Sequence, residues 1–383
     1  MHSTLALFTT LATISTVLVY ASPILPKAIS SDNVVVPIAP APRSSLVSSA
    51  SSGSLDNFSA TVEVIKGSVP EEKDLETRQT GPFTTLTTAQ IASFKPFSYF
   101  AAAGYCDPSD ILRWGCGANC KANADFIPTA SGGNGGSVQF WFVGYSPSLD
   151  TVIISHQGTD PTEFESLLTD ADFFLDTLDP TLFPGVPKGV EIHNGFGEAH
   201  KDTAQSVLSA VQTTLSRHQT SKVTLVGHSL GGALSLLDSI YLPLHLSTTP
   251  GGTKITYKTI VYGVPRVGNP AFADYVDQHV DLTRVNNDND LIPIVPGRFL
   301  GFAHPNGEVH IQDDEKTWVG CPGHDNTSPL CTIGTVPTVF EGNILDHLGP
   351  YDGVEMASFT CVEGSEEQAG LGNGEWMELE WNL

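Results

Sequence analysis

Basic residues are scarce in this chain. It carries 18 lysines and arginines against 42 aspartates and glutamates, which gives a formal net charge of −24 at pH 7. A balance this acidic creates a long-range field that repels nucleic acids and anionic membrane surfaces. The composition therefore argues against a nucleic acid partner, although it says nothing about the fold.

Long apolar runs are missing after the N-terminus. Residues 5–19 are almost entirely apolar or small, and the small-residue site Val19-Tyr20-Ala21 follows them. This run of roughly 15 residues is shorter than the ~20 that a bilayer span needs. It is typical of a secretory signal peptide. We therefore expect residues 1–21 to be a signal peptide, the protein to be secreted and extracellular, and no transmembrane segment.

The chain also lacks any Cys-x-x-Cys pair, which argues against a metal site. Six cysteines in an oxidising compartment instead suggest three disulfides. Close spacing favours two local loops, which leaves one pair to tie the start of the domain to its end. The expected pairs are Cys116–Cys120, Cys321–Cys331 and Cys106–Cys361.

Composition divides the chain into a domain and two flanking segments. Residues 22–79 contain low-complexity serine stretches and bury too little apolar surface to offset the entropy of ordering, so we expect a pro-segment or a flexible arm. Residues 80–362 form one domain, and residues 363–383 form an acidic tail. Asn57 and Asn326 match the glycosylation pattern, which makes a glycoprotein the expectation.

Helix and strand patterns alternate through the domain, which favours an α/β sheet with helices on its faces. The expected strands are 138–143, 151–155, 223–226, 259–262 and 282–285. The expected helices are 88–105, 204–215, a helix beginning after residue 229, and 270–279.

The most informative motif follows the strand at 223–226. It reads Gly227-His228-Ser229-Leu230-Gly231, and an apolar helix pattern comes directly after it. A Gly-x-Ser-x-Gly sequence between a strand and a helix is typical of a nucleophile elbow, in which a strained serine faces the substrate. The helix N-terminus also directs free N–H groups at an oxyanion nearby. Ser229 is therefore the candidate nucleophile, and the alternative is a plain Gly/Ser turn.

A catalytic serine needs a base to take its proton and an acid to orient that base. In α/β hydrolases both residues come after the serine in the chain, first the acid and then the histidine. Asp288 and Asp290 both come just after the strand at 282–285, where such sheets place their sites. Either one could also be a turn residue. Four histidines lie downstream, and the pattern alone does not choose among them: His304, His310, His324 and His347.

Four motifs in order give the chain a family resemblance over roughly residues 85–362. They are 227–233 (GHSLGGA), 262–269 (YGVPRVGN), 284–293 (RVNNDNDLIP) and 346–351 (DHLGPY). Together they resemble the fungal class 3 triacylglycerol lipases of the filamentous-fungus type. The resemblance implies an α/β-hydrolase fold, with a central, mostly parallel sheet flanked by helices and a short helical lid. It selects Asp290 and His347 as catalytic and implies the same three disulfides.

The resemblance also implies an oxyanion hole and a lid. Leu230 would donate one backbone N–H, and Thr159, in the loop after the strand at 151–155, would donate the other. Residues 156–157 are His-Gln, where relatives carry Phe/His-Arg. The next segment begins Asp160-Pro161, a typical helix start. A lid helix would present one apolar face there: Phe164, Leu167 and Leu168.

These residues predict a secreted carboxylic ester hydrolase, a triacylglycerol lipase that forms an acyl-enzyme and opens its lid at an oil–water interface. We expect a lipid or ester substrate, a monomer, and no cofactor. A feruloyl or other polar-ester esterase on the same fold is the first alternative, and a phospholipase is another. A non-catalytic lipid-binding protein on a hydrolase scaffold is the alternative from a different class.

Overall fold

A computed structural model describes residues 34–36, 81–160 and 173–361 of the chain. The signal peptide expected at 1–21, nearly all of the segment 22–79, the acidic tail at 363–383 and glycosylation at Asn57 lie outside these residues. The lid residues Phe164, Leu167 and Leu168 lie outside them as well. Within the described residues, no helix combines the length and the apolar character needed to cross a bilayer.

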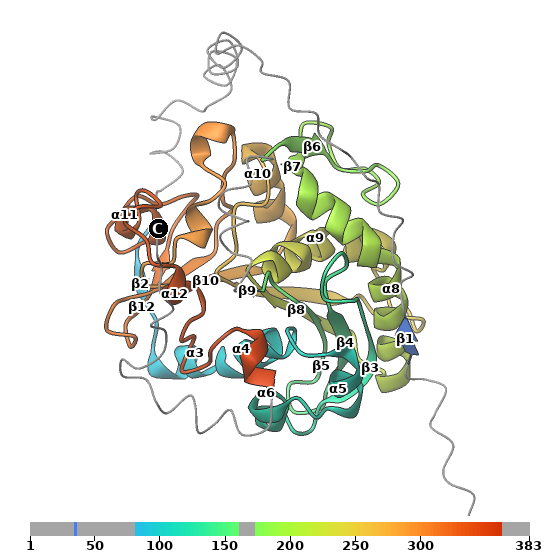
Figure 1. Cartoon of the computed structure of the whole chain (residues 1–383). Helices are drawn as coiled ribbons and strands as arrows, with labels where there is room; N and C mark the ends of the chain where they lie inside the picture. Colours follow the sequence, from blue (N-terminus) through green and yellow to red (C-terminus); the bar gives the residue numbers. More distant parts are fainter. Residues whose placement is uncertain (1–33, 37–80, 161–172, 362–383) are drawn as a thin grey trace, which may run out of the picture. The chain divides into compact units, whose positions relative to one another are not determined.

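A ten-stranded sheet organises the described domain (Figure 1). Neighbouring strands from β5 to β11 pair in parallel, and antiparallel pairs join β3, β4 and β5 at one side and β11, β12 and β2 at the other. In spatial order the strands are β1 (Val34–Val36), β3 (Ile127–Gly132), β4 (Trp141–Ser146), β5 (Thr151–His156), β8 (Lys222–His228), β9 (Thr256–Tyr262), β10 (Leu282–Asn287), β11 (Glu308–Ile311), β12 (Trp318–Cys321) and β2 (Thr84–Thr85). A separate hairpin pairs β6 (Leu175–Thr177) with β7 (Glu191–His193).

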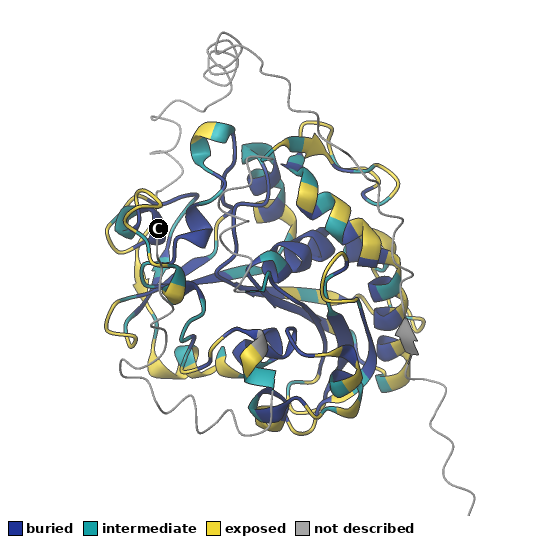
Figure 2. Cartoon of the chain, in the orientation of Figure 1, coloured by how far each residue is buried: buried dark blue, intermediate teal, exposed yellow. Residues whose placement is uncertain are grey.

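Helices cover both faces of the sheet. The α-helices are α3 (Thr88–Ala92), α4 (Lys95–Ala103), α5 (Pro108–Arg113), α6 (Gly117–Ala122), α8 (Asn194–His218), α9 (Leu230–His245), α10 (Pro270–His279), α11 (Thr332–Thr335) and α12 (Ile344–His347). The described residues also form three 3-10 turns: η2 (Ile292–Ile294), η3 (Arg298–Leu300) and η4 (Ser358–Cys361). In Figure 2 the central strands and α9 are mostly buried, whereas an outer helix such as α8 alternates between buried and exposed residues.

Side chains alternate between two cores, as strand geometry requires. In β5, Val152 and Ile154 join the core formed with α8, α9 and α10, whereas Ile153 joins the core formed with α4. All three side chains have no solvent exposure. Because both faces are buried, the central strands read as nearly continuous apolar runs, which is typical of a parallel sheet under two layers of helix.

The helix expected at 88–105 is divided in the structure. Thr87 caps α3 through a capping box with Gln90, and α4 starts again at Lys95 with Pro96 in its first turn. Proline is tolerated only at such a start, because its ring blocks the preceding turn. The expectation of one continuous helix was therefore wrong at this proline.

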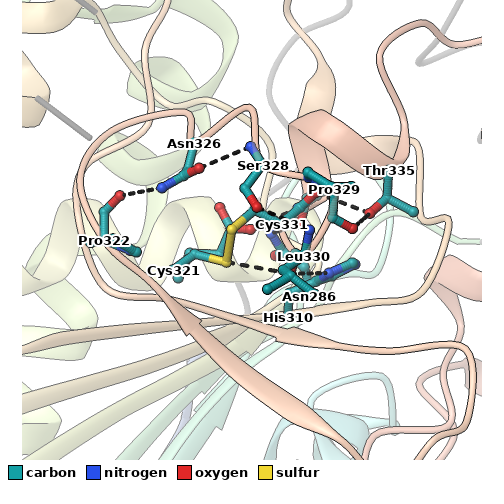
Figure 3. Close-up of a disulfide and its surroundings, with 12 residues drawn as sticks. Asn286, His310, Cys321, Pro322, Asn326, Ser328, Pro329, Leu330, Cys331 and Thr335 are labelled. Atoms are coloured by element: carbon teal, nitrogen blue, oxygen red, sulfur yellow. Dashed lines mark hydrogen bonds between the residues drawn. A yellow bond between two sulfur atoms is a disulfide. The ribbon is translucent and has the colours of Figure 1, made fainter. Parts of the chain in front are cut away.

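Three disulfides stabilise the domain, and they are the three expected pairs. Cys106–Cys361 joins the end of α4 to η4 across 255 residues. Cys116–Cys120 spans α6, and Cys321–Cys331 closes a loop after β12 (Figure 3). Such bonds stabilise a fold by about 2–4 kcal/mol each, largely by restricting the unfolded chain.

Asn326, the second glycosylation candidate, lies in that loop (Figure 3). Its side chain is 3% exposed, and its Nδ2 donates to the Pro322 carbonyl at 2.8 Å. Its Oδ1 accepts from the Ser328 N–H at 2.9 Å. Since the nitrogen that would carry a glycan is buried and bonded, the folded domain disfavours glycosylation at Asn326.

Candidate active site

The nucleophile elbow forms where β8 ends and α9 begins. Ser229 has φ 56° and ψ −130°, a strained conformation for a residue with a side chain. The turn closes tightly around it. A Cβ on Gly227 would lie 2.3 Å from the Gly231 carbonyl oxygen, and a Cβ on Gly231 would lie 2.2 Å from the His156 carbonyl oxygen. The glycines of the motif are therefore required by close backbone approach on both sides of the serine.

Of the two candidate acids, Asp290 is the one whose carboxylate reaches a histidine. Its Oδ2 lies 2.8 Å from Nδ1 of His347, and both side chains have no solvent exposure. Its Oδ1 accepts from the Ile292 N–H at 2.8 Å, which fixes the carboxylate at the turn into η2. Asp288, the alternative, instead accepts from Nδ2 of Asn289 at 2.9 Å.

His347 ends α12 and lies beside the elbow. Its ring centroid is 4.3 Å from that of His228, the residue before Ser229. A Cβ on Gly263 would lie 2.8 Å from both Nδ1 and Cε1 of His347. Ser229 N–H donates to the Tyr262 carbonyl, one residue before that glycine. The imidazole and the serine thus both lie at the edge of the sheet where β8 and β9 end.

The other candidate histidines have different partners. Nε2 of His304 donates to the Pro293 carbonyl at 2.8 Å, and Nε2 of His310 donates to the Asp288 carbonyl at 2.8 Å. Nε2 of His324 lies 2.7 Å from Oδ2 of Asp277. None of these three contacts involves a residue of the elbow.

The electrostatics favour a neutral base. Burial lowers the pKa of His347 below its ordinary value, so the imidazole is uncharged at neutral pH and can accept a proton. Because the carboxylate of Asp290 accepts at Nδ1, the proton of the neutral ring is held there and Nε2 is left as the basic nitrogen. Oγ of Ser229 has no hydrogen-bond partner among the residues that the structure describes.

A second buried histidine supports the first, and sequence reasoning missed it. Nε2 of His228 donates to the His347 carbonyl at 2.7 Å, so its Nδ1 accepts from the Tyr105 hydroxyl at 2.6 Å. Burial lowers the pKa of His228 well below its ordinary value, which keeps the imidazole ring neutral. In the sequence, only its position directly before Ser229 indicates that His228 could belong to the site.

The loop after β5 packs on the first turn of α9. A Cβ on Gly158 would lie 2.1 Å from the Tyr105 hydroxyl oxygen and 2.6 Å from the His228 carbonyl oxygen. Thr159 follows this contact and is partly exposed. Leu230 is the first residue of α9, so its N–H is among those without an acceptor inside the helix. Both expected oxyanion donors therefore belong to segments that meet beside Ser229.

Beyond the undescribed residues 161–172, the apolar residues at 173–183 divide into two groups. Phe174 is 63% exposed. Leu178 and Phe183 are buried in the core with α8 and α9, so they are not part of an apolar surface near the lid. The apolar composition of residues 173–183 predicts that this stretch extends the apolar surface near the lid, and that prediction is wrong for Leu178 and Phe183.

Comparison with known proteins gives a consistent family. The model of the family "Lipase (class 3)" matches residues 153–300. A secreted mono- and diacylglycerol lipase of Malassezia restricta, LIP2, is 32% identical over 217 residues, which are 56% of this chain and 65% of that protein. MDL3 of Malassezia globosa, which has the same description, is 32% identical over 222 residues, or 57% of this chain and 69% of its own length. The chain thus spans slightly under two thirds of the LIP2 relative.

Solved structures agree with these relatives. Lipase II from Rhizopus niveus is 28% identical, with a TM-score of 0.61, and the match covers 73% of this chain and all of that one. A triacylglycerol lipase whose catalytic centre is described as a serine protease triad is 25% identical, with a TM-score of 0.60 over 72% of this chain and 99% of that chain. The fold is the α/β-hydrolase fold of these enzymes, and the chain belongs to the class 3 lipase family.

Proposed function

We propose that this chain is a secreted carboxylic ester hydrolase, a triacylglycerol lipase that works through an acyl-enzyme on Ser229. One observation carries the proposal. The buried hydrogen bond between His347 and Asp290 lies next to a serine in an elbow with positive φ. A buried acid, a neutral imidazole and a strained serine at one sheet edge form the arrangement that activates a hydroxyl for acyl transfer.

In the first half-reaction, Oγ of Ser229 attacks the ester carbonyl while Nε2 of His347 takes its proton. Asp290 holds the ring and stabilises the imidazolium. The N–H groups of Leu230 and Thr159 stabilise the oxyanion, and each such donor can contribute about 3–4 kcal/mol. The tetrahedral intermediate collapses, the ester C–O bond breaks, and His347 gives its proton to the leaving alcohol.

Water completes the cycle. His347 takes a proton from a water molecule, whose oxygen attacks the acyl carbonyl. The second tetrahedral intermediate releases the fatty acid, and the proton returns to Oγ of Ser229. The chain's own residues supply every proton transfer in this sequence.

Substrate choice is the open part of the proposal. The Malassezia relatives are named mono- and diacylglycerol lipases, so a preference for partial glycerides is the second candidate function. Comparing emulsified triolein, diolein and monoolein separates the two. Methyl ferulate in the same panel tests the polar-ester alternative.

Lid gating is the conformational part of the proposal. A helix carrying Phe164, Leu167 and Leu168 would cover the serine in water and turn outward onto lipid, because an oil–water interface stabilises exposed apolar area. The observable is a rise in rate as the ester passes from dissolved monomer to emulsion. A smooth saturation curve with no rise at that point refutes gating.

The decisive variant is Ser229→Ala, assayed on emulsified triolein beside Ser239→Ala. Ser239 is a buried serine of α9 whose hydroxyl donates to the Leu236 carbonyl, so it controls for loss of a hydroxyl in the same helix. We expect Ser229→Ala to lose nearly all activity with an unchanged melting curve, and Ser239→Ala to stay active. Activity above a trace in Ser229→Ala refutes the assignment, and a wild-type protein without esterase activity favours the lipid-binding alternative.

A further inference from the structure

A buried cluster of two histidines and a carboxylate lies next to the site, and the proposed chemistry does not use it. His156 ends β5, His200 lies in α8 and Asp238 lies in α9. Nε2 of His156 is 2.7 Å from Oδ2 of Asp238, and Nε2 of His200 is 2.9 Å from Oδ1. All three side chains have no solvent exposure. One carboxylate therefore joins three separate elements.

Both histidines donate a hydrogen bond to the carboxylate of Asp238. A carboxylate oxygen accepts, so both Nε2 atoms carry protons and donate to Asp238. Nδ1 of His156 and Nδ1 of His200 have no hydrogen-bond partner among the described residues. Burial opposes the charge of Asp238, but hydrogen bonds from the two histidines bring its pKa down to about 2, so it stays ionised.

His156 connects the cluster to the loop that contains Thr159, one of the two proposed oxyanion donors. The chain leaves β5 at His156 and reaches Thr159 three residues later. On the other side, Asp238 is two helical turns into α9, the helix that begins at Leu230. The His156–Asp238 hydrogen bond thus joins the strand that leads to one proposed oxyanion donor to the helix that presents the other.

Two further contacts hold the loop after β5, residues 157–159, against its neighbours. Gln157 exchanges hydrogen bonds with Phe140 on the neighbouring strand segment: its N–H donates to the Phe140 carbonyl at 2.8 Å, and its Oε1 accepts from the Phe140 N–H at 2.9 Å. The His156 carbonyl abuts Gly231, where an added Cβ would lie only 2.2 Å away. Gln157 thus ties the loop to the residue before β4, and His156 ties it to α9.

We propose that Asp238 is a positioning residue for the oxyanion hole, which sets the separation of the Thr159 and Leu230 N–H groups by holding His156 against α9. His200 donates to the other carboxylate oxygen from α8, so it adds to the stability of the cluster but lies outside the link between the two oxyanion donors. This inference rests on the proposed function, since it assigns a task to the oxyanion donors of that site. A buried charge is often replaceable by apolar residues without loss of stability, so a specific geometric role is the better reason for its presence here.

The test compares the two histidines, which are equally buried and bond to the same carboxylate. Variants His156→Leu and His200→Leu each remove one donor to Asp238. His156→Gln keeps an N–H donor where Nε2 was. Each variant is assayed with p-nitrophenyl butyrate below its solubility limit. A trifluoromethyl ketone, whose adduct on the serine places an oxyanion in the hole, is the probe of the hole.

We expect His156→Leu to lower kcat about tenfold to a hundredfold, as small misplacements of catalytic groups do, with KM changed less than about twofold. Its inhibition constant for the ketone should rise by the same factor. His156→Gln should recover most of both losses. His200→Leu should lose a similar amount of thermal stability but keep kcat within about threefold.

Equal losses of kcat in His156→Leu and His200→Leu, tracking their melting temperatures, overturn the proposal and indicate a purely structural cluster. If His156→Leu does not fold, Asp238→Asn decides. Its amide accepts from one ring only, so we expect lower kcat and weaker ketone inhibition, and wild-type values overturn the proposal. Failure of the proposed function gives a different result from failure of the positioning role. In that case the wild-type protein has no esterase activity, or Ser229→Ala keeps it.

Discussion

Nδ1 of His347 lies 2.8 Å from Oδ2 of Asp290, across 57 residues of sequence and with both side chains fully buried. This contact orients the imidazole, because the carboxylate can only accept and Nδ1 must therefore carry the proton. Nε2, the ring nitrogen that carries no proton in this tautomer, is then the one that can act as a base. The contact links the turn after β10 to α12, so two loops must be placed correctly for it to form.

Replacing Asp290 with asparagine should leave the fold intact and remove most of the activity. An amide can hold the ring in the other tautomer, with Nε2 protonated and unable to accept from the serine. A loss on the order of 10⁴-fold in kcat is expected for such a tautomer change. Asp288→Asn, two residues earlier, is the control and should retain activity. Comparable losses in the two variants would show that Asp290 has been misassigned.

Gly263→Ala should displace the catalytic imidazole. The added Cβ would meet Nδ1 and Cε1 of His347 at 2.8 Å, and φ is 50°. We expect kcat to fall at least about tenfold, since misplacement on this scale disrupts near-attack geometry. Gly252→Ala separates this effect from backbone strain, because Gly252 has φ 80° and no heavy atom within 4 Å of its added Cβ. A fully active Gly263→Ala would contradict the position of His347.

Tyr105→Phe should destabilise the site by leaving Nδ1 of His228 without its donor. An unsatisfied buried acceptor costs about 1–3 kcal/mol, and the loss should appear in urea denaturation. Because His228 also donates to the His347 carbonyl, activity should fall severalfold as well. Tyr257→Phe, which removes a hydroxyl bonded to the Leu246 carbonyl far from the elbow, should lose stability without losing activity. An unchanged kcat in Tyr105→Phe would limit the tyrosine to a structural role.

Asp346→Asn should change how stability depends on pH. Burial, then the nearby charge of Asp288, raises the pKa of Asp346 to about 6 from its ordinary 3.8. The folded state therefore holds a proton that the unfolded state releases between those values, and wild-type stability falls as pH rises through this window. The melting temperature of the variant relative to wild type should rise from pH 4 to pH 7. A difference that is constant with pH would contradict the raised pKa.

Local signals predicted the elements whose ends carry strong caps. The helix expected at 270–279 has those bounds in α10, because Asn269 caps it and Pro270 opens it. The strands β3, β11 and β12 were not predicted. In β3, Pro128 and Gly132 interrupt the strand pattern, and the pairing with β4 slips between Pro128 and Ala130. Sheet partners, which a single sequence does not reveal, stabilise this strand.

The sequence predicts a site residue when a reactive residue type stands inside a recognisable motif. Site residues outside such motifs could not be predicted from the sequence alone. Ser229 stands in a motif, but choosing Asp290 over Asp288 required family resemblance. The supporting contacts had no local signature: His156, His200 and Asp238 are far apart in sequence and meet only because β5, α8 and α9 converge. Tertiary packing creates such buried networks, so a pattern along the chain cannot identify them.

The most direct test of the central claim is to locate the nucleophile chemically. The purified protein is treated with a fluorophosphonate, digested, and the modified peptide is identified by mass spectrometry, with His347→Asn treated in parallel. A reactive triad predicts a single adduct on Ser229 in the wild type, loss of esterase activity in step with labelling, and labelling slowed at least about a thousandfold in His347→Asn. An adduct on another residue, or equal labelling of the two proteins, would contradict the assignment of Ser229, His347 and Asp290 as one catalytic unit.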